Sequence, residues 1–266
     1  MQFTQLEFLL FWVCVLVTVW GVDRLARTPQ PRHCVLLAAS YYFYAYWDWR
    51  FCLLLAASTA VDFMLARAMN SVHGLRLRRM LLVGSVVFNL GLLGFFKYCN
   101  FFIESAAAVL EPRAIATGTL DVVLPVGISF FTFQTLSYSI DVYRRRIEPC
   151  KSILDFSLYV AFFPQLVAGP IVRATELMPQ FARKPDFSSR RLYAGVQCVL
   201  RGLVKKVLIA DRLGEMVDVV FEGPELYHGI TVWLAIIAYA GQIYYDFSGY
   251  TDIAIGVAKT LGYRFP

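Results

Sequence analysis

Long apolar runs separated by short polar segments dominate the chain. Residues 6–22 contain one charged side chain, Glu7, and residues 51–66 and 80–96 are nearly as apolar. A bilayer core needs about 20 predominantly apolar residues for each helix that crosses it. The pattern therefore predicts an all-α polytopic membrane protein with about seven transmembrane helices. No basic residue precedes the first run and no small-residue cleavage site follows it, so we expect a retained helix rather than a signal peptide.

The runs are spread along the whole chain. There is no repeat of 20–50 residues and no linker rich in Gly, Ser or Pro, so we expect residues 1–266 to form a single membrane domain. The apolar runs cover residues 6–22, 34–47, 51–66, 80–102, 122–140, 153–172, 193–210 and 229–247, and a final short run covers 253–262.

The charges of the connecting segments predict an orientation. Basic side chains gather at 23–33, 67–79 and 141–151, whereas acidic side chains outnumber basic ones between the fourth and fifth runs. Basic loops usually remain in the cytoplasm. This rule places the N-terminus outside and the 141–151 loop inside. The same loops account for the formal net charge of +6, so the charge is no sign of a nucleic-acid partner.

The sixth run is interrupted. Residues 162–173, FFPQLVAGPIVR, contain Pro164, Gly169 and Pro170. Proline removes a backbone donor and disfavours helix in the residue before it, and glycine permits a tight bend. The loop that follows, 173–191, is basic, so a full crossing by this run would place positive charge outside. We therefore predict a re-entrant element that enters and leaves on the cytoplasmic side.

Irregular backbone at membrane depth is tolerated only where it is buried in protein or lines a wet cavity. The interrupted run is therefore a candidate wall of a cavity that binds substrate. The residues that we expect to line it are Pro164, Gln165, Gly169 and Pro170.

A second polar stretch lies at 244–252, YYDFSGYTD. Asp246, Ser248, Tyr250 and Asp252 are candidate cavity-lining residues at the junction of two apolar runs. In one interpretation the helix breaks here and presents these groups to a cavity. In the other, Ser248 or Thr251 caps a helix over 253–262 and Asp252 favours its positive end. Both can hold at once.

Other ionisable residues lie within or beside apolar runs. An ionisable residue inside a membrane segment is costly and usually faces a partner or a cavity. Lys97, Lys205 and Lys206 are close to run ends, where their ammonium groups can reach the membrane surface, and we favour this structural interpretation for the three. Asp62 and Arg201 also belong to this class of candidates.

Neither histidines nor cysteines form a recognisable site. His33, His73 and His228 fall in segments that we expect to be loops, outside the apolar spans. The six cysteines are scattered singly, which is typical of small apolar filler and not of a metal site. The residues taken by themselves predict no catalytic constellation and no bound metal.

Several stretches together resemble one family. They are SYYFYAYWDWRF (40–51), GFFKYCNFF (94–102), LPVGISFFTFQTLSYSIDVYR (124–144), FFPQLVAGPIVR (162–173), RGLVKKVLIADRL (201–213) and YYDFSGYTDIAIGVAKTLGYRFP (244–266). On these stretches, which occur in family order over most of the chain, the chain resembles the membrane-bound O-acyltransferases, in particular the bacterial branch of alginate O-acetylases.

The resemblance implies an inner-membrane enzyme that moves an acyl group, most often acetyl, from a cytoplasmic donor toward hydroxyls of an exported polysaccharide such as alginate. It implies no bound cofactor, an acyl donor such as acetyl-CoA as substrate, and part of a tunnel formed by this region. The implied partners are membrane lipid, periplasmic acetyl-transfer helper proteins and, indirectly, the polysaccharide, with no nucleic acid.

The resemblance also marks a departure. The family's histidine would lie beyond Pro266, and His33, His73 and His228 match none of its positions. No catalytic residue is therefore assigned, and the chain by itself is expected to be inactive, as the N-terminal portion of such an enzyme. Two alternatives remain, a transporter or channel and a non-catalytic membrane scaffold, since broken helices and buried charges also mark transporters.

Overall fold

The computed structural model describes residues 3–109, 123–167 and 169–266, and every regular element in these ranges is helical. The helices are α1 (Leu6–Leu25), α2 (Gln30–Asp48), α3 (Arg50–Ser71), α4 (Leu75–Val109), α5 (Ile128–Tyr143), α6 (Ile153–Ala161), α7 (Phe163–Leu166), α8 (Ala174–Phe181), α9 (Ser189–Leu203), α10 (Asp211–Phe221) and α11 (Gly229–Thr260). A π-helical segment, Val204–Ala210, joins α9 to α10, and a 3₁₀ turn, Pro224–Leu226, precedes α11.

Three of these helices are long and apolar enough to cross a membrane. They are α1, α3 and the Leu75–Ile103 part of α4, with mean hydropathies of 1.9, 1.6 and 1.8. The expectation of an all-α membrane protein is confirmed over the described residues. The number of about seven crossings stays a prediction, because α2 and α11 are less apolar and the other helices are shorter.

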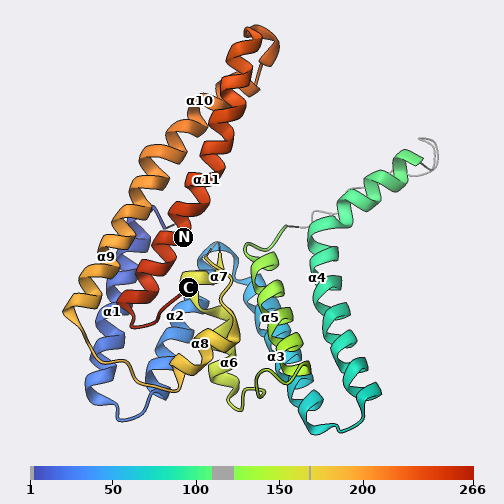
Figure 1. Cartoon of the computed structure of the whole chain (residues 1–266), viewed down its shortest axis with the longest axis vertical. Helices are drawn as coiled ribbons and strands as arrows, with labels where there is room; N and C mark the ends of the chain where they lie inside the picture. Colours follow the sequence, from blue (N-terminus) through green and yellow to red (C-terminus); the bar gives the residue numbers. More distant parts are fainter. Residues whose placement is uncertain (1–2, 110–122, 168) are drawn as a thin grey trace.

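The body of the molecule is a bundle in which α1 to α6 pack side by side (Figure 1). The buried face of α3 shows how the sequence forms it: Leu55, Ser58, Asp62, Ala66 and Met69 recur at three- and four-residue spacing. Such spacing places side chains on one helical face. The partners of this face are α2, α4, α5 and α6.

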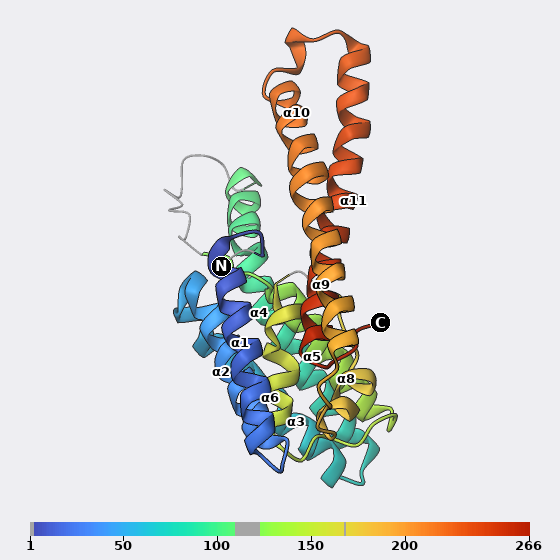
Figure 2. The same cartoon turned by 90° about the vertical axis from the view of Figure 1, so that its left-hand side faces the viewer.

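A long antiparallel arm projects from the bundle. One side of the arm is α9, the π-helical segment and α10 in succession, and the other side is α11 (Figures 1 and 2). Glycines face each other across it. A Cβ on Gly202 would lie 2.6 Å from the carbonyl oxygen of Gly249, and a Cβ on Gly195 would lie 2.8 Å from that of Gly256. Small residues at such positions let two membrane helices approach closely.

The basic loops meet at one end of the molecule, opposite the tip of the arm (Figure 1). Arg67 donates to the carbonyl of Lys151 at 3.2 Å, which joins the 67–79 and 141–151 loops. Lys184 donates to the carbonyl of Ala26 at 2.9 Å, which joins the 173–191 and 23–33 loops. The charge rule assigns all four loops to the cytoplasm, so this end is the one expected to face it.

The stretch 244–252 does not break. Helix α11 runs without interruption from Gly229 to Thr260, so the broken-helix interpretation is wrong, and so is the interpretation that Ser248 or Thr251 caps a helix over 253–262. Gly249 is explained by the close approach of α9. Asp246, Ser248 and Asp252 have partners on the other side of the arm, so these polar groups do not have to interrupt the helix.

Candidate functional site

The interrupted run 162–173 forms the centre of the candidate site. Helix α6 ends at Ala161, α7 is a single turn from Phe163 to Leu166, and α8 starts at Ala174. Pro164 lies in the first turn of α7, where a missing backbone donor is tolerated. Nine residues of α6 span about 14 Å, under half of the roughly 30 Å of a bilayer core. The structure thus gives this run the geometry that a re-entrant course requires.

Residues 162–166 of the interrupted run are buried, and side chains bond to backbone groups within the run and near the end of α6. The amide of Phe163 donates to Ser40 Oγ at 3.1 Å, and the Tyr159 hydroxyl donates to the carbonyl of Val172 at 3.2 Å. The side-chain amides of Gln134 and Gln165 both donate to the carbonyl of Tyr159, at 2.7 and 2.6 Å. Buried irregular backbone needs such partners. The segment is therefore an ordered part of the fold, held in place by hydrogen bonds to side chains.

Two of the predicted cavity residues have specific roles here. A Cβ at Gly169 would lie 2.5 Å from the Cα of Gln165, so the tight bend requires glycine at this position. Gln165 is 3% exposed, and its Oε1 accepts no hydrogen bond from the described residues. A buried acceptor without a donor is costly, which makes Gln165 the polar group in this segment most suited to a substrate hydroxyl. Pro164 is buried and Pro170 half-buried.

The second predicted stretch carries an interhelical charge cluster. Lys205 Nζ lies 2.6 Å from Asp252 Oδ2 and 2.8 Å from Ser248 Oγ. Lys206 Nζ lies 2.5 Å from Asp246 Oδ1 and 2.9 Å from Asp211 Oδ1. We call these residues the arm charge cluster. The prediction that Lys205 and Lys206 extend to the membrane surface is wrong, because both are held by carboxylates across the arm.

The π-helical segment explains how both lysines reach α11. Adjacent residues of an α-helix point in different directions and do not share a face. Here Lys205 and Lys206 lie within the π-helical segment Val204–Ala210, and both contact acids of α11. π-Helical turns inside helices occur often at functional sites. Lys97, by contrast, is exposed, and its extension to the surface stays a prediction.

Aromatic rings connect the two stretches. The ring of Phe163 lies 5.9 Å from that of Phe43, Phe43 lies 5.9 Å from Phe3, and Phe3 lies 5.6 Å from Tyr250. Tyr250 in turn has Lys206 Nζ 5.4 Å from its ring centroid. The fold therefore places the interrupted run and the arm charge cluster on either side of one apolar layer. The cavity-lining role of the eight predicted residues stays a prediction, since the cavities described at the basic end of the molecule have other walls.

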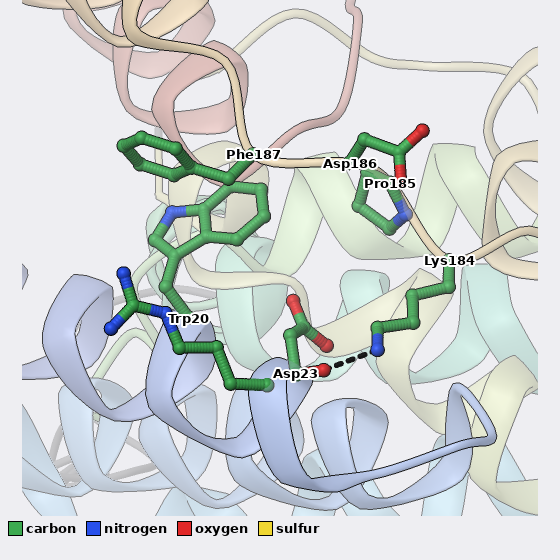
Figure 3. Close-up of a pocket in the computed structure, with 7 residues that line it drawn as sticks. Trp20, Asp23, Lys184, Pro185, Asp186 and Phe187 are labelled. Carbon is green, nitrogen blue, oxygen red and sulfur yellow. Dashed lines mark hydrogen bonds between the residues drawn. The ribbon is translucent and has the colours of Figure 1, made fainter.

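One cavity, of about 200 Å³, lies at the basic end (Figure 3). The Phe187 ring packs edge-on against the ring of Trp20, with centroids 5.2 Å apart, and Lys184 extends to the carbonyl of Asp23. The walls are Trp20, Asp23, Arg24, Lys184, Pro185, Asp186 and Phe187. Because both charge signs line it, the cavity shows no preference for an anion or a cation.

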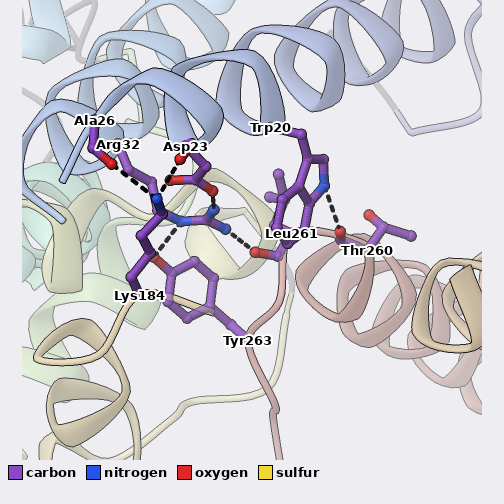
Figure 4. Close-up of polar contacts among 8 residues, drawn as sticks. All are labelled: Trp20, Asp23, Ala26, Arg32, Lys184, Thr260, Leu261 and Tyr263. Carbon is purple, nitrogen blue, oxygen red and sulfur yellow. Dashed lines mark hydrogen bonds and ion pairs between the residues drawn. The ribbon is translucent and has the colours of Figure 1, made fainter. Parts of the chain in front are cut away.

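Next to this cavity, a buried arginine binds the residues that follow α11 and holds them against the bundle (Figure 4). The Arg32 side chain is fully buried, pairs with Asp23, donates to the carbonyl of Leu261 and donates to the Tyr263 hydroxyl at 3.1 Å. Its guanidinium also lies 5.0 Å from the Trp20 ring centroid. A planar fork with several donors suits such a site, which a lysine cannot reproduce.

His33 is not in a loop, and that prediction is wrong. It lies inside α2, is 1% exposed, and its Nδ1 is 2.7 Å from Asp155 Oδ1 on α6. Burial lowers the pKa of His33, and the hydrogen bond to Asp155 opposes that shift. His33 lines neither the cavity beside Trp20 nor the basic hollow at the start of α9. We therefore assign this buried, paired side chain no catalytic role.

The basic hollow, of about 370 Å³, lies where α9 begins. Ser188 caps this helix by accepting from the amide of Arg191. The hollow is lined by Ser188, Arg190, Arg191, Ala194, Lys259 and Arg264, with no acidic side chain among them. Cations beside the N-terminus of a helix attract anions. Compared with the cavity beside Trp20, which both charge signs line, this hollow is better suited to a phosphate-bearing molecule.

Comparisons with known proteins agree with these features. Residues 150–265, which contain the interrupted run and the whole arm, match the membrane-bound O-acyltransferase family. The chain is 39% identical over 238 residues to the probable alginate O-acetylase AlgI of Pseudomonas aeruginosa, covering 88% of this chain and 45% of that protein. The chain belongs to this family.

Two further relatives differ in what their names say they modify. The chain is 33% identical over 267 residues to the peptidoglycan O-acetyltransferase of Helicobacter pylori, covering 91% of this chain and 50% of that protein. It is 21% identical over 173 residues to the teichoic acid D-alanyltransferase of Streptococcus thermophilus, covering 63% of this chain and 41% of that protein. The chain thus spans about half the length of these curated relatives.

Proposed function

We propose that this chain supplies a tunnel-forming region of a membrane O-acyltransferase, which transfers acetyl groups from a cytoplasmic donor toward hydroxyls of an exported polysaccharide such as alginate. The observation that carries the proposal is the 38–39% identity to probable alginate O-acetylases over 88% of the chain. The peptidoglycan O-acetyltransferase at 33% identity supports acetyl transfer to a glycan and leaves the polymer open. The proposed location is the bacterial inner membrane, with several crossings.

In the proposed reaction a substrate hydroxyl attacks the carbonyl carbon of an acetyl thioester. The new C–O bond forms, the C–S bond breaks, and the proton of the hydroxyl passes through a general base to the thiolate that leaves. Such a base is required because an alcohol is a weak nucleophile at neutral pH. We assign the base to no residue among those that the structure describes. The role proposed for this chain is to bind and orient both substrates.

The donor would approach at the basic end. An acetyl-CoA-like donor carries several phosphates, and the basic hollow offers Arg190, Arg191, Lys259 and Arg264 without an opposing acid. A cleft lined by one sign of charge raises the local concentration of an oppositely charged ligand. The interrupted run lies deeper, packed against α11. We propose that it borders the path along which the acetyl group moves, with Gln165 facing that path.

The transporter alternative loses one of its supports. It depended on two broken membrane segments, at 162–173 and 244–252, and the second is a continuous helix. A non-catalytic scaffold would also lose ester on deletion, but it would not need the basic hollow, so the charge variants in the experiment that follows separate it from the enzyme.

The test is the acetyl-ester content of the exported polysaccharide in cells that lack the gene and in complemented cells. Deletion should remove most of the ester, and a wild-type copy should restore it. A copy with Arg190→Gln and Lys259→Gln should restore less, whereas Arg212→Gln is the matched control. Arg212 is an exposed arginine that pairs with Glu215 three residues away. Unchanged acetyl content after deletion would refute the proposed function.

A further inference from the structure

A cluster of polar side chains lies inside the bundle, between α3, α4 and α5. Asp62 on α3, Ser85 and Asn89 on α4, and Thr135 and Ser139 on α5 are all 0% exposed. These three helices pack against one another in the bundle (Figure 1). We call these five residues the Asp62 cluster. Both α3 and the relevant part of α4 are among the three helices apolar enough to cross a membrane, and Asp62 is near the middle of α3.

Every contact of the Asp62 carboxylate in this cluster is with a neutral group. Oδ1 accepts from Ser85 Oγ at 2.8 Å and from Asn89 Nδ2 at 2.8 Å, and Oδ2 is 3.0 Å from the same amide. Ser85 Oγ is also 3.1 Å from Ser139 Oγ, and Thr135 Oγ1 is 3.1 Å from Asn89 Oδ1. The five side chains thus form one connected network across three helices.

Asp62 has no basic partner in the part of the chain that the structure describes. Its hydrogen bonds come from Ser85 and Asn89. The ion pairs found among the described residues all involve acids other than Asp62. A charge buried in a low-dielectric interior is costly unless it is paired. In membrane proteins an ionisable residue at this depth marks an ion or proton site by default. Asp62 at this position therefore needs either a bound cation or a proton.

The network also has more acceptors than donors. A carboxylate offers about four lone-pair sites and no donor when ionised, whereas each hydroxyl donates only once. Ser58, one turn before Asp62 on the same face of α3, is 1% exposed, and its Oγ has no hydrogen-bond partner among the described residues. The unpartnered Ser58 hydroxyl is a second and independent indication of a ligand at the Asp62 cluster. Hydroxyls can rotate their hydrogens away and turn a lone pair toward a cation.

We propose that the Asp62 cluster binds one Na⁺ ion between α3, α4 and α5. The ligands would be the Asp62 carboxylate and hydroxyl oxygens of the cluster, with Ser58 Oγ completing the set. Oxygen ligands of this kind suit hard cations. Na⁺ is favoured over the larger K⁺ because the proposed ligand oxygens are closely spaced: Ser85 Oγ lies 2.8 Å from Asp62 Oδ1 and 3.1 Å from Ser139 Oγ. The site is separate from the acyl-transfer function, and either proposal can fail alone.

The experiment measures the thermal unfolding midpoint of the purified protein in detergent, in NaCl, KCl or N-methylglucamine chloride of equal ionic strength. A ligand at ten times its Kd should raise the midpoint by roughly 3–6 °C for a protein of this size. We expect this rise in NaCl only. A direct measurement is the binding of ²²Na⁺ to the same protein, which should saturate at one ion per chain.

Three variants separate the site from general stability. Asp62→Asn should abolish both the Na⁺-specific rise and the binding of ²²Na⁺. Adding Asn89→Asp to that variant returns a carboxylate to the facing helix, and should restore both. Ser58→Ala should weaken binding several-fold, whereas Ser71→Ala should not, because Ser71 is exposed on the same helix and its hydroxyl bonds to the carbonyl of Arg67.

Two results would overturn the proposal. One is an equal midpoint in NaCl and N-methylglucamine chloride for the wild-type protein, which would mean that Asp62 carries a proton instead. The other is undiminished ²²Na⁺ binding by Asp62→Asn. If that variant does not fold, the Ser58→Ala and Ser71→Ala pair decides alone, and equal Na⁺ affinity in the two would refute the site.

Discussion

Replacing Gly202 with alanine should loosen the arm. A Cβ at this position would lie 2.6 Å from the carbonyl oxygen of Gly249, and 2.7 and 2.8 Å from two atoms of Ile253. An ordinary contact is about 3.4 Å, so α9 and α11 would have to separate by roughly 0.8 Å. Two of the three obstructing atoms belong to the backbone of α11 and cannot rotate away. Overpacking of this kind costs about 1–3 kcal/mol.

Gly84→Ala is the matched control. Gly84 lies within α4, and a Cβ there would have nothing within 4 Å. Both substitutions gain the same helix propensity, about 1 kcal/mol, because both replace glycine inside a helix. The difference between the two variants therefore isolates the packing cost. We expect Gly202→Ala to be less stable than Gly84→Ala by about 1–3 kcal/mol.

The assay is the thermal unfolding midpoint of each variant in the same detergent. A difference of 1–3 kcal/mol corresponds to roughly 2–12 °C for a protein of this size. The reasoning would be refuted if Gly202→Ala unfolded at the same temperature as Gly84→Ala, or at a higher one. That result would mean that the two sides of the arm do not pack through their glycines.

Three further changes test other parts of the structure. Lys206→Met should lower the free energy of unfolding by about 1–2 kcal/mol, measured by denaturation. The loss is smaller than for a fully buried ion pair because the Asp246 carboxylate is 42% exposed. Adding Asp246→Asn should recover part of it. Arg32→Lys should lower the unfolding midpoint by several degrees because the fork of donors is lost, whereas Arg27→Lys, at an exposed position, should not. Burial lowers the pKa of His33, so its contribution to stability is complete above pH 6.5 and is lost as the pH falls below that value. His33→Gln should flatten this part of the pH–stability curve, and an unchanged slope would contradict the assignment.

Local patterns predict much of the fold. The apolar runs mark the long helices, and Pro164 with Gly169 marks the break after α6. Both features depend on residues close together in the chain, as helix propensity and proline sterics do. The basic loops, identified by charge alone, also lie at one end of the molecule.

Pairing between distant segments could not be predicted in the same way. Asp246 lies close to a serine and a glycine in sequence, which suggested a break, but its partner is Lys206 on the other side of the arm. His33 follows a proline and an arginine, which suggested a loop, but it pairs with Asp155 more than a hundred residues away. Such contacts arise from helix packing, which single-segment patterns do not encode.

The spacing of glycines is a sequence signal that could have predicted the arm. Gly195 and Gly202 are seven residues apart, and so are Gly249 and Gly256. Equal spacing of glycines on two long apolar helices predicts that they face each other in an antiparallel pair. This pairing would have indicated a continuous α11, and it would have placed the two lysines near the acids of YYDFSGYTD.

The proposed role of the interrupted run depends on its entering and leaving from one side of the membrane. The most direct measurement is labelling of single cysteines by a membrane-impermeant reagent in intact cells and in inverted vesicles. Lys151→Cys and Ser189→Cys flank the run at exposed positions, in a background without the six native cysteines, and Glu225→Cys marks the tip of the arm. We predict that the first two react only in inverted vesicles and the third only in intact cells. Labelling of Lys151→Cys and Ser189→Cys from opposite sides would show that the run crosses the membrane, and would contradict the re-entrant element.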